Sequence, residues 1–179
     1  MENFYRMKIA GLERDLPLCK VNENMDIAAF IMFNDVEITY ACAKALLEKC
    51  PDFDVIITAE AKGIPLAYEM ARQSGKNYIV ARKGAKLYMK DPVFVSVRSI
   101  TTDHMQTLFL DSSERELLCG KKVLIVDDVI STGESLEALV KLVTESGGNI
   151  AAKAAVLAEG DAAQRKDILF LEPLPLFFK

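Results

Sequence analysis

The stretch VLIVDDVISTGES, residues 123–135, decides the fold of this chain. It begins with four consecutive β-formers, Val123–Val126, which predict a short strand buried on both faces, as in a parallel sheet. Two carboxylates, Asp127 and Asp128, follow at the carboxyl end of that strand, and a turn of small and hydroxyl-bearing residues comes next. The stretch therefore predicts a strand, a polar turn and the start of a helix.

The residues after the turn repeat with the period of an amphipathic helix. Its apolar positions recur at i, i+3, i+4 and i+7, as Leu136, Leu139, Val140 and Val143. In open α/β sheets, ligands bind at the carboxyl ends of the strands, and the free N–H groups of a helix N-terminus suit a phosphate. A carboxylate accepts hydrogen bonds, which suits it to sugar hydroxyls. A ribose 5-phosphate matches both halves of this stretch, whereas a plain strand-to-helix crossover with surface acids is the alternative.

The rest of the chain alternates between strand and helix patterns. Asn34-Asp35 can cap a helix with an apolar face, and a second helix is predicted at Gly63–Arg72. We expect an α/β fold, a mostly parallel sheet flanked by helices on both faces, with an antiparallel excursion. The first ~35 residues show no clear period, so no helix or strand is predicted there. Strands are predicted at Asp54–Ala59, Asn77–Ala81, Val93–Ile100, Met105–Leu110, Ile150–Leu157 and Ile168–Leu171.

Composition restricts the class of protein. A chain of 179 residues fits one domain, residues 1–179, and its net charge of −4 argues against a nucleic-acid partner. The N-terminus lacks a signal-peptide pattern, and the longest apolar run, Ile27–Phe33, is too short to span a bilayer. Four cysteines without C-x-x-C spacing fit a reduced, cytoplasmic protein.

With its Asp-Asp pair, two apolar residues and Ser-Thr-Gly-x-Ser, the stretch resembles the phosphoribosyl pyrophosphate (PRPP) signature of type I phosphoribosyltransferases. The resemblance extends from about Asp54 to Leu157 and implies that family's fold, with a small N-terminal hood and a flexible-loop excursion. It implies that Asp127 and Asp128 are catalytic and hold the ribose hydroxyls of PRPP. The 5-phosphate would be bound by Ser131, Thr132, Gly133, Glu134 and Ser135, although Glu134 stands where many members have glycine.

A second strand-to-helix turn, within Thr58–Pro65, resembles the pyrophosphate loop of the same family. Lys62 would supply the positive charge there, and Gly63 would allow close packing or unusual backbone dihedrals. Adenine phosphoribosyltransferases usually carry Ala-Arg-Gly at this place, and xanthine phosphoribosyltransferases lack the basic residue. Ala61-Lys62-Gly63 is therefore closer to the adenine enzymes.

The segment Arg82–Lys90 holds four basic residues and no acid in a net-acidic chain. Such a cluster attracts phosphates and can neutralise charge on a leaving pyrophosphate. It resembles the Arg-Lys-x-x-Lys-Leu segment of adenine phosphoribosyltransferases, which reaches PRPP, often across a dimer interface. The resemblance implies that Arg82, Lys83 and Lys86 bind PRPP and that the protein is a homodimer; a solvated surface hairpin is the alternative.

One segment departs from the adenine pattern. Adenine enzymes usually show Leu-Glu-Tyr-Gly where this chain places Thr102, so the glutamate proposed to protonate the purine is missing, and Asp103 is its nearest substitute. His104, the only histidine, is left out of the mechanism. We expect Cys19 and Val21 of the hood, together with Glu159 at a strand end, to line the base pocket.

The sequence thus predicts a purine phosphoribosyltransferase, with adenine favoured, that acts on PRPP and a free base. Magnesium would arrive bound to PRPP, and no residue is assigned as a protein ligand to a metal. Two alternatives remain open: a xanthine or other 6-oxopurine phosphoribosyltransferase, and a non-catalytic PRPP-sensing regulator of purine metabolism. Such a regulator carries an added DNA-binding domain before the transferase fold, whereas here only about fifty residues precede the Asp54 strand, and the resemblance assigns them to the hood and the first helix.

Overall fold

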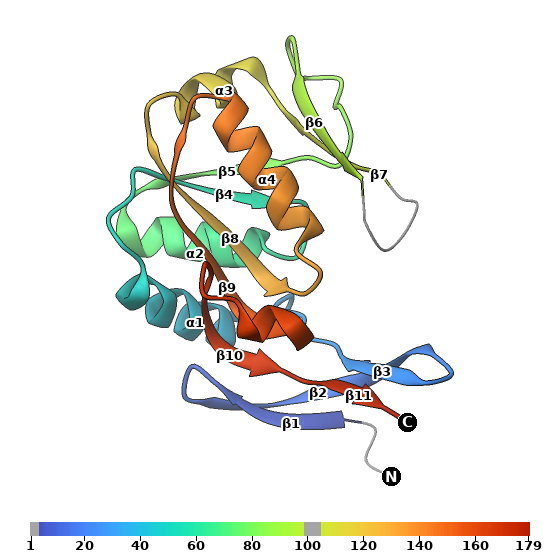
Figure 1. Cartoon of the computed structure of the whole chain (residues 1–179). Helices are drawn as coiled ribbons and strands as arrows, with labels where there is room; N and C mark the ends of the chain where they lie inside the picture. The colour runs from blue at the N-terminus through green and yellow to red at the C-terminus, as the bar shows by residue number, and fades with distance from the viewer. Residues whose placement is uncertain (1–3, 99–104) are drawn as a thin grey trace.

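The computed structural model describes residues 4–98 and 105–179. At its centre lies a five-stranded sheet with the strand order β10-β9-β8-β4-β5, in which all neighbouring strands are parallel (Figure 1). The predicted mostly parallel α/β sheet is therefore confirmed. The strands are β4 (Val55–Ala59), β5 (Asn77–Ala81), β8 (Lys122–Ile130), β9 (Asn149–Glu159) and β10 (Leu169–Leu174).

Helices cover both faces of this sheet, as the buried runs in its strands require. The helices α1 (Val36–Lys49) and α2 (Ile64–Ser74) pack on one face, and α4 (Glu134–Glu145) packs on the other. All five residues of β4 are buried because successive side chains point into the two opposite layers. Asp35 caps α1 as predicted, accepting a hydrogen bond from the backbone N–H of Ile38.

The strand order places the two polar turns opposite each other. In chain order, the five strands run β4, β5, β8, β9 and β10, so the direction of winding reverses between β4 and β8. A reversal of this kind leaves a crevice at the carboxyl ends of the two strands, where ligands bind in open α/β sheets. The turn after β4 and the turn after β8 both open into this crevice.

The N-terminal residues, for which no helix or strand was predicted, form a regular sheet. Three strands, β1 (Phe4–Ile9), β2 (Leu12–Asn22) and β3 (Met25–Ala28), pair antiparallel. They bury few side chains and expose many charged ones, which weakens the apolar alternation on which a strand prediction depends.

The C-terminal strand β11 (Leu176–Phe178) pairs antiparallel with β3 and completes this four-stranded sheet, which we call the hood. The hood is therefore not purely N-terminal, and Figure 1 shows both ends of the described chain in it. An edge-on contact between the rings of Tyr5 and Phe177, 5.2 Å between centroids, joins the two termini.

A two-stranded antiparallel hairpin, β6 (Val93–Arg98) and β7 (Met105–Leu110), confirms the predicted excursion. It is joined to the sheet by a bridge between Arg82 and Phe109. The helix α3 (Ser112–Leu118) was not predicted, because only Leu118 of its seven residues is buried; a capping box from Asp111 to Glu114 was its signal in the sequence. The short 3-10 helix η1 covers Gly160–Gln164. None of the described helices is both long and apolar enough to cross a membrane.

Candidate functional site

The acid pair lies inside a strand and not after it, which corrects the sequence prediction. β8 continues to Ile130 because Asp127 and Val129 stay in register with residues of β9. Side chains of a strand alternate between its faces, so the two carboxylates point in different directions. Asp128 is 2% exposed and Asp127 is half-buried. The pair forms a rigid, recessed wall of the crevice.

The signature turn, Ser131–Ser135, leads from β8 into α4. Gly133 is the N-cap of α4 with φ of +85°, a conformation that side-chain-bearing residues rarely adopt. Because glycine offers no capping oxygen, the free N–H groups of the first helical turn are available to an anion. The turn lines a pocket of about 110 Å³, well below the roughly 300–1,000 Å³ of sites that hold a whole drug-sized ligand. This pocket is therefore a subsite of the size that suits a single anionic group.

The turn after β4, Glu60–Gly63, reaches the acid pair directly, and we call it the lysine turn. Lys62 Nζ lies 2.9 Å from Asp128 Oδ2, an ion pair between a half-exposed lysine and a buried carboxylate. That oxygen has no directed hydrogen bond within the described part of the chain, so the lysine is what balances its charge. Burial, and then the negative charge of Asp128, raise the pKa of Asp127 well above its ordinary value, and Lys62 offsets part of this effect.

Gly63 has no room for a side chain. A Cβ atom at this position would stand 2.3 Å from Thr58 Oγ1 and 3.0 Å from Asp127 Oδ1. Thr58 is fully buried at the end of β4, so its hydroxyl has little room to move. Only glycine lets the lysine turn approach the acid pair this closely, as the sequence suggested.

The basic segment, Arg82–Lys90, is tied to the lysine turn by Glu60. The backbone N–H of Lys83 donates to Glu60 Oε2 over 3.0 Å, and Lys86 Nζ lies 3.8 Å from Glu60 Oε1. The hydrogen bond from Lys83, and the nearby charges of Lys86 and Arg82, lower the pKa of Glu60. The structure therefore brings the basic segment to the lysine turn, and Glu60 is a link that the sequence reasoning missed.

Arg165 is a second residue that the sequence reasoning missed. Its Nη1 atom would lie 2.8 Å from a Cβ atom at Gly133, so the guanidinium rests against the signature turn. Asp167 holds it in place through hydrogen bonds of 2.9 and 2.8 Å to Nε and Nη2. No motif marks this arginine, because it reaches the turn from the far end of η1.

The expected base-binding residues come from two different parts of the fold. Cys19 and Val21 are exposed on β2 of the hood, and Glu159 is the last residue of β9, where η1 begins. β9 reaches the hood here, since a Cβ atom at Gly160 would meet the Leu176 side chain at 2.9 Å. Thr102, which stands in the place of the missing glutamate, its nearest substitute Asp103, and His104 all lie outside the described residues.

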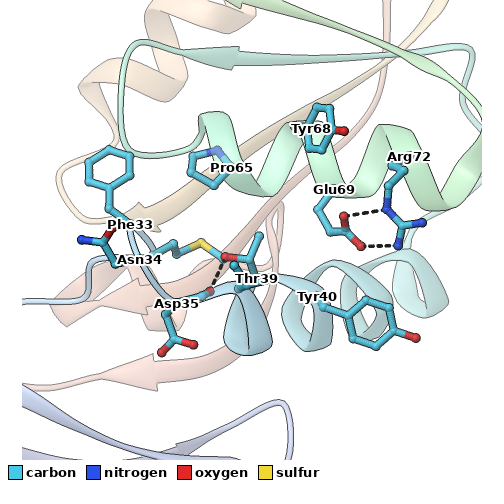
Figure 2. Close-up of a pocket in the computed structure, with 11 residues that line it drawn as sticks. Phe33, Asn34, Asp35, Thr39, Tyr40, Pro65, Tyr68, Glu69 and Arg72 are labelled. Carbon is cyan, nitrogen blue, oxygen red and sulfur yellow. Dashed lines mark hydrogen bonds and ion pairs between the residues drawn. The ribbon is translucent and has the colours of Figure 1, made fainter.

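A larger cleft of about 550 Å³ lies between α1 and α2. Figure 2 shows Phe33 and Pro65 at one end and the ion pair between Glu69 and Arg72 at the other. Its remaining walls include the exposed rings of Tyr40 and Tyr68. The cleft touches the lysine turn only through α2 and contains no residue of the signature turn, so it is separate from the acid pair.

The crevice thus combines three kinds of group. An anion subsite lies at the signature turn, hydrogen-bond acceptors lie at the acid pair, and cations from the lysine turn and the basic segment lie beyond it. This order suits a sugar that carries an anionic group at each end. Among the described residues, no group of three His, Cys, Asp or Glu side chains is placed to hold a metal ion.

Comparisons with known proteins agree with this geometry. Residues 36–172 match the model of the phosphoribosyl transferase domain. A curated adenine phosphoribosyltransferase of Thermotoga neapolitana is 38% identical over 58% of each chain, so the matched part spans less than two thirds of that relative's length. The purine biosynthesis transcriptional repressor of Bacillus subtilis is 30% identical over 64% of this chain and 39% of its own. The solved adenine phosphoribosyltransferase of Thermoanaerobacter pseudethanolicus has the same fold, with a TM-score of 0.68 at 19% identity, covering 96% of this chain and 95% of that one.

The crowding at Gly63 yields a prediction. Gly63→Ala should lower the free energy of unfolding by about 1–3 kcal/mol, the usual cost of overpacking, because the new methyl group overlaps Thr58 Oγ1. Urea unfolding measures this. Gly84→Ala is the matched control, since a Cβ atom there meets nothing within 4 Å. Adding Thr58→Ala to Gly63→Ala should recover part of the loss. Equal stability of the Gly63 and Gly84 variants would refute the crowding.

Proposed function

Because this chain belongs to the phosphoribosyl transferase domain family, we propose that it transfers the phosphoribosyl group of PRPP to a free purine base, adenine being favoured. The products are a nucleoside 5′-monophosphate and pyrophosphate, as in purine salvage. The observation that carries this proposal is the ion pair of Lys62 with the buried Asp128, which joins the lysine turn to β8, the strand that leads into the signature turn. It supports a single substrate that spans both turns.

In the proposed reaction, each part of the crevice has one task. The 5-phosphate is bound by the signature turn, and the ribose hydroxyls donate to Asp127 and Asp128. The pyrophosphate lies beside Lys62, Arg82, Lys83 and Lys86, whose charges stabilise it as the bond from the anomeric carbon to oxygen breaks. The base nitrogen forms the new bond to that carbon and loses its proton, for which one carboxylate of the pair is the acceptor. Position and charge suffice, so no covalent nucleophile is needed.

Magnesium fits this site as part of the substrate complex. Mg²⁺ keeps several of its waters and is usually bound by one or two carboxylates together with substrate phosphates. The acid pair offers that number of carboxylates, but Asp128 Oδ2 is already paired with Lys62 Nζ at 2.9 Å, so the substrate would supply most of the ligands. When bound, the ion would neutralise charge on the pyrophosphate. We therefore propose Mg²⁺ as the cofactor, carried mainly by PRPP.

Adenine is the proposed base because two segments follow the adenine pattern. Ala61-Lys62-Gly63 and Arg82–Leu87 resemble the adenine enzymes, and the curated relative in Thermotoga is an adenine enzyme. The absence of a glutamate at Thr102 favours a 6-oxopurine instead. Cys19, Val21 and Glu159 remain the proposed lining of the base pocket.

A PRPP-sensing regulator is the second candidate function, and the similarity to the Bacillus subtilis repressor favours it. Such a protein would use the same crevice without turnover. The net charge of −4 argues against DNA contacts by this chain.

We further propose that residues 1–179 form one domain and that two such chains form a homodimer. We also propose that the protein lies in the cytoplasm. The cleft between α1 and α2 supports the dimer, because Val36, Tyr40 and Tyr68 expose apolar surface beside it, and homodimer interfaces bury such surface. The free cysteines suit a reducing compartment.

The first test is PRPP binding. Calorimetry with PRPP and magnesium should detect it, and Asp128→Asn or Thr132→Val should weaken it by about 1–3 kcal/mol, because each removes a group proposed to form a hydrogen bond with the substrate. Thr144→Val, near the C-terminal end of α4, is the matched control and should bind PRPP as the wild type does. If both site variants keep wild-type affinity, the assignment of the signature turn is wrong.

The second test identifies the base. The protein is incubated with PRPP and magnesium and offered adenine, guanine, hypoxanthine, xanthine or orotate, and pyrophosphate release is measured. We expect release with adenine and strong rejection of the 6-oxopurines, because a pocket built for an amino group leaves polar groups unpaired against an oxygen. Release with xanthine alone would overturn adenine, and release with orotate alone would overturn the purine class. If the protein binds PRPP but releases pyrophosphate with none of the five bases, the regulator is favoured.

The third test concerns the dimer. Sedimentation velocity should show a dimer, and Tyr68→Lys should shift it toward the monomer, because a charge buried in an apolar interface is costly. Leu117→Lys, at an exposed position of α3, is the matched control and should leave the dimer intact. A monomeric wild-type protein would contradict the proposal.

A further inference from the structure

Gln106 is a polar residue on the buried face of the β6–β7 hairpin. Alternate residues of a strand share a face, so Gln106 lies on the same side of β7 as Leu108 and Leu110, both of which are fully buried. That face packs against α4, where Leu139 belongs to the same core. An apolar side chain would suit the packing at this position, so the amide of Gln106 calls for a separate explanation.

The amide has one well-formed contact, and it leads to the signature turn. Gln106 Nε2 donates to Ser135 Oγ over 2.8 Å. Ser135 is the second residue of α4 and lines the 110 Å³ pocket. An amide NH₂ can only donate, so Ser135 Oγ is the acceptor in this contact, and its single O–H is left to donate elsewhere. A phosphate oxygen is an acceptor, and the pocket beside Ser135 is where such an oxygen would lie.

The strand that carries Gln106 is held at two positions that follow it. Thr107 Oγ1 and Ser96 Oγ lie 2.9 Å apart across the hairpin. Further along, Arg82 and Phe109 exchange two backbone hydrogen bonds of 2.9 and 2.8 Å. Binding groups are most effective when the residues behind them stand on rigid elements. Gln106 therefore holds its partner from a fixed strand, and not from a loop.

We infer that Gln106 is a positioning residue for the phosphate subsite: it orients the Ser135 hydroxyl so that its proton points to the phosphate of the substrate. The inference rests on the proposed function, because the phosphate is the 5-phosphate of PRPP. Gln106 itself does not touch that group. It raises affinity by keeping the hydroxyl in the donating orientation before the ligand arrives, which reduces the ordering needed on binding.

Ribose 5-phosphate is the probe for the test, because it occupies the phosphate subsite without any transfer to a base. Calorimetry compares the wild type with Gln106→Leu, Ser135→Ala and the double variant. Gln106→Leu should weaken binding about 3- to 10-fold, the range of one net hydrogen bond, with an unchanged melting temperature. The double variant should bind no more weakly than Ser135→Ala, because the effect of Gln106 passes through that hydroxyl.

Two further variants separate orientation from packing. Gln106→Glu keeps the shape but accepts the Ser135 proton and adds negative charge, so it should weaken binding more than Gln106→Leu. Thr144→Val removes a hydroxyl contact near the opposite end of α4 and should bind as the wild type does.

The outcomes also separate this inference from the proposed function. If the wild type binds ribose 5-phosphate and the Gln106 variants bind it equally well, only the role of Gln106 is wrong. The role of Gln106 is also wrong if the affinity loss of the double variant equals the product of the losses from Gln106→Leu and Ser135→Ala, because the two residues would then act independently. If the wild type does not bind ribose 5-phosphate at all, the phosphate subsite is wrong, and both the proposed function and this inference fail with it.

Discussion

The ion pair between Lys62 and Asp128 is the contact on which the site depends. A buried carboxylate is costly unless a positive charge balances it, and here the balance comes from a half-exposed lysine on the neighbouring turn. The pair can form only because β4 and β8 are adjacent and parallel, so that their carboxyl ends meet. It also requires glycine at position 63, since any side chain there would push the lysine turn away from Asp127. Sheet order, glycine and ion pair are therefore parts of one arrangement.

Several features of this crevice were predictable because they depend on local sequence. The structure confirms three of them: Val123–Val126 is a buried strand, Asp35 caps a helix, and Gly63 allows close packing. The strand end was misjudged because polar residues were taken to end β8. In fact, backbone pairing with β9 carries the strand through Asp127 and Asp128 to Ile130. Pairing with a distant strand is not visible in a local pattern.

The contacts that were missed join residues far apart in the chain. Glu60 meets the basic segment, Gln106 meets Ser135, and Arg165 meets Gly133. Each pair is separated by more than twenty positions, and none follows a spacing rule. A hood was implied by the resemblance, but its four-stranded sheet was not predicted for a related reason, because its fourth strand, Leu176–Phe178, comes from the opposite end of the chain. Sequence patterns thus located the groups that face the ligand better than the groups that hold them in place.

The charge around the signature turn explains why support from outside the turn is needed. Asp127, Asp128 and Glu134 all lie in or beside a turn that is proposed to bind a phosphate, and like charges repel it. The dipole of a helix N-terminus provides only about half a positive charge against them. Arg165 lies against Gly133 in a cluster with Lys153 and Asp167 that has two cations and one carboxylate and is therefore net positive, and Lys62 already compensates Asp128. A turn with glycine in place of Glu134 would need less of this compensation. The acidic residue in the turn and the arginine behind it are therefore best understood together: the cation allows the turn to carry an acid and still accept an anion.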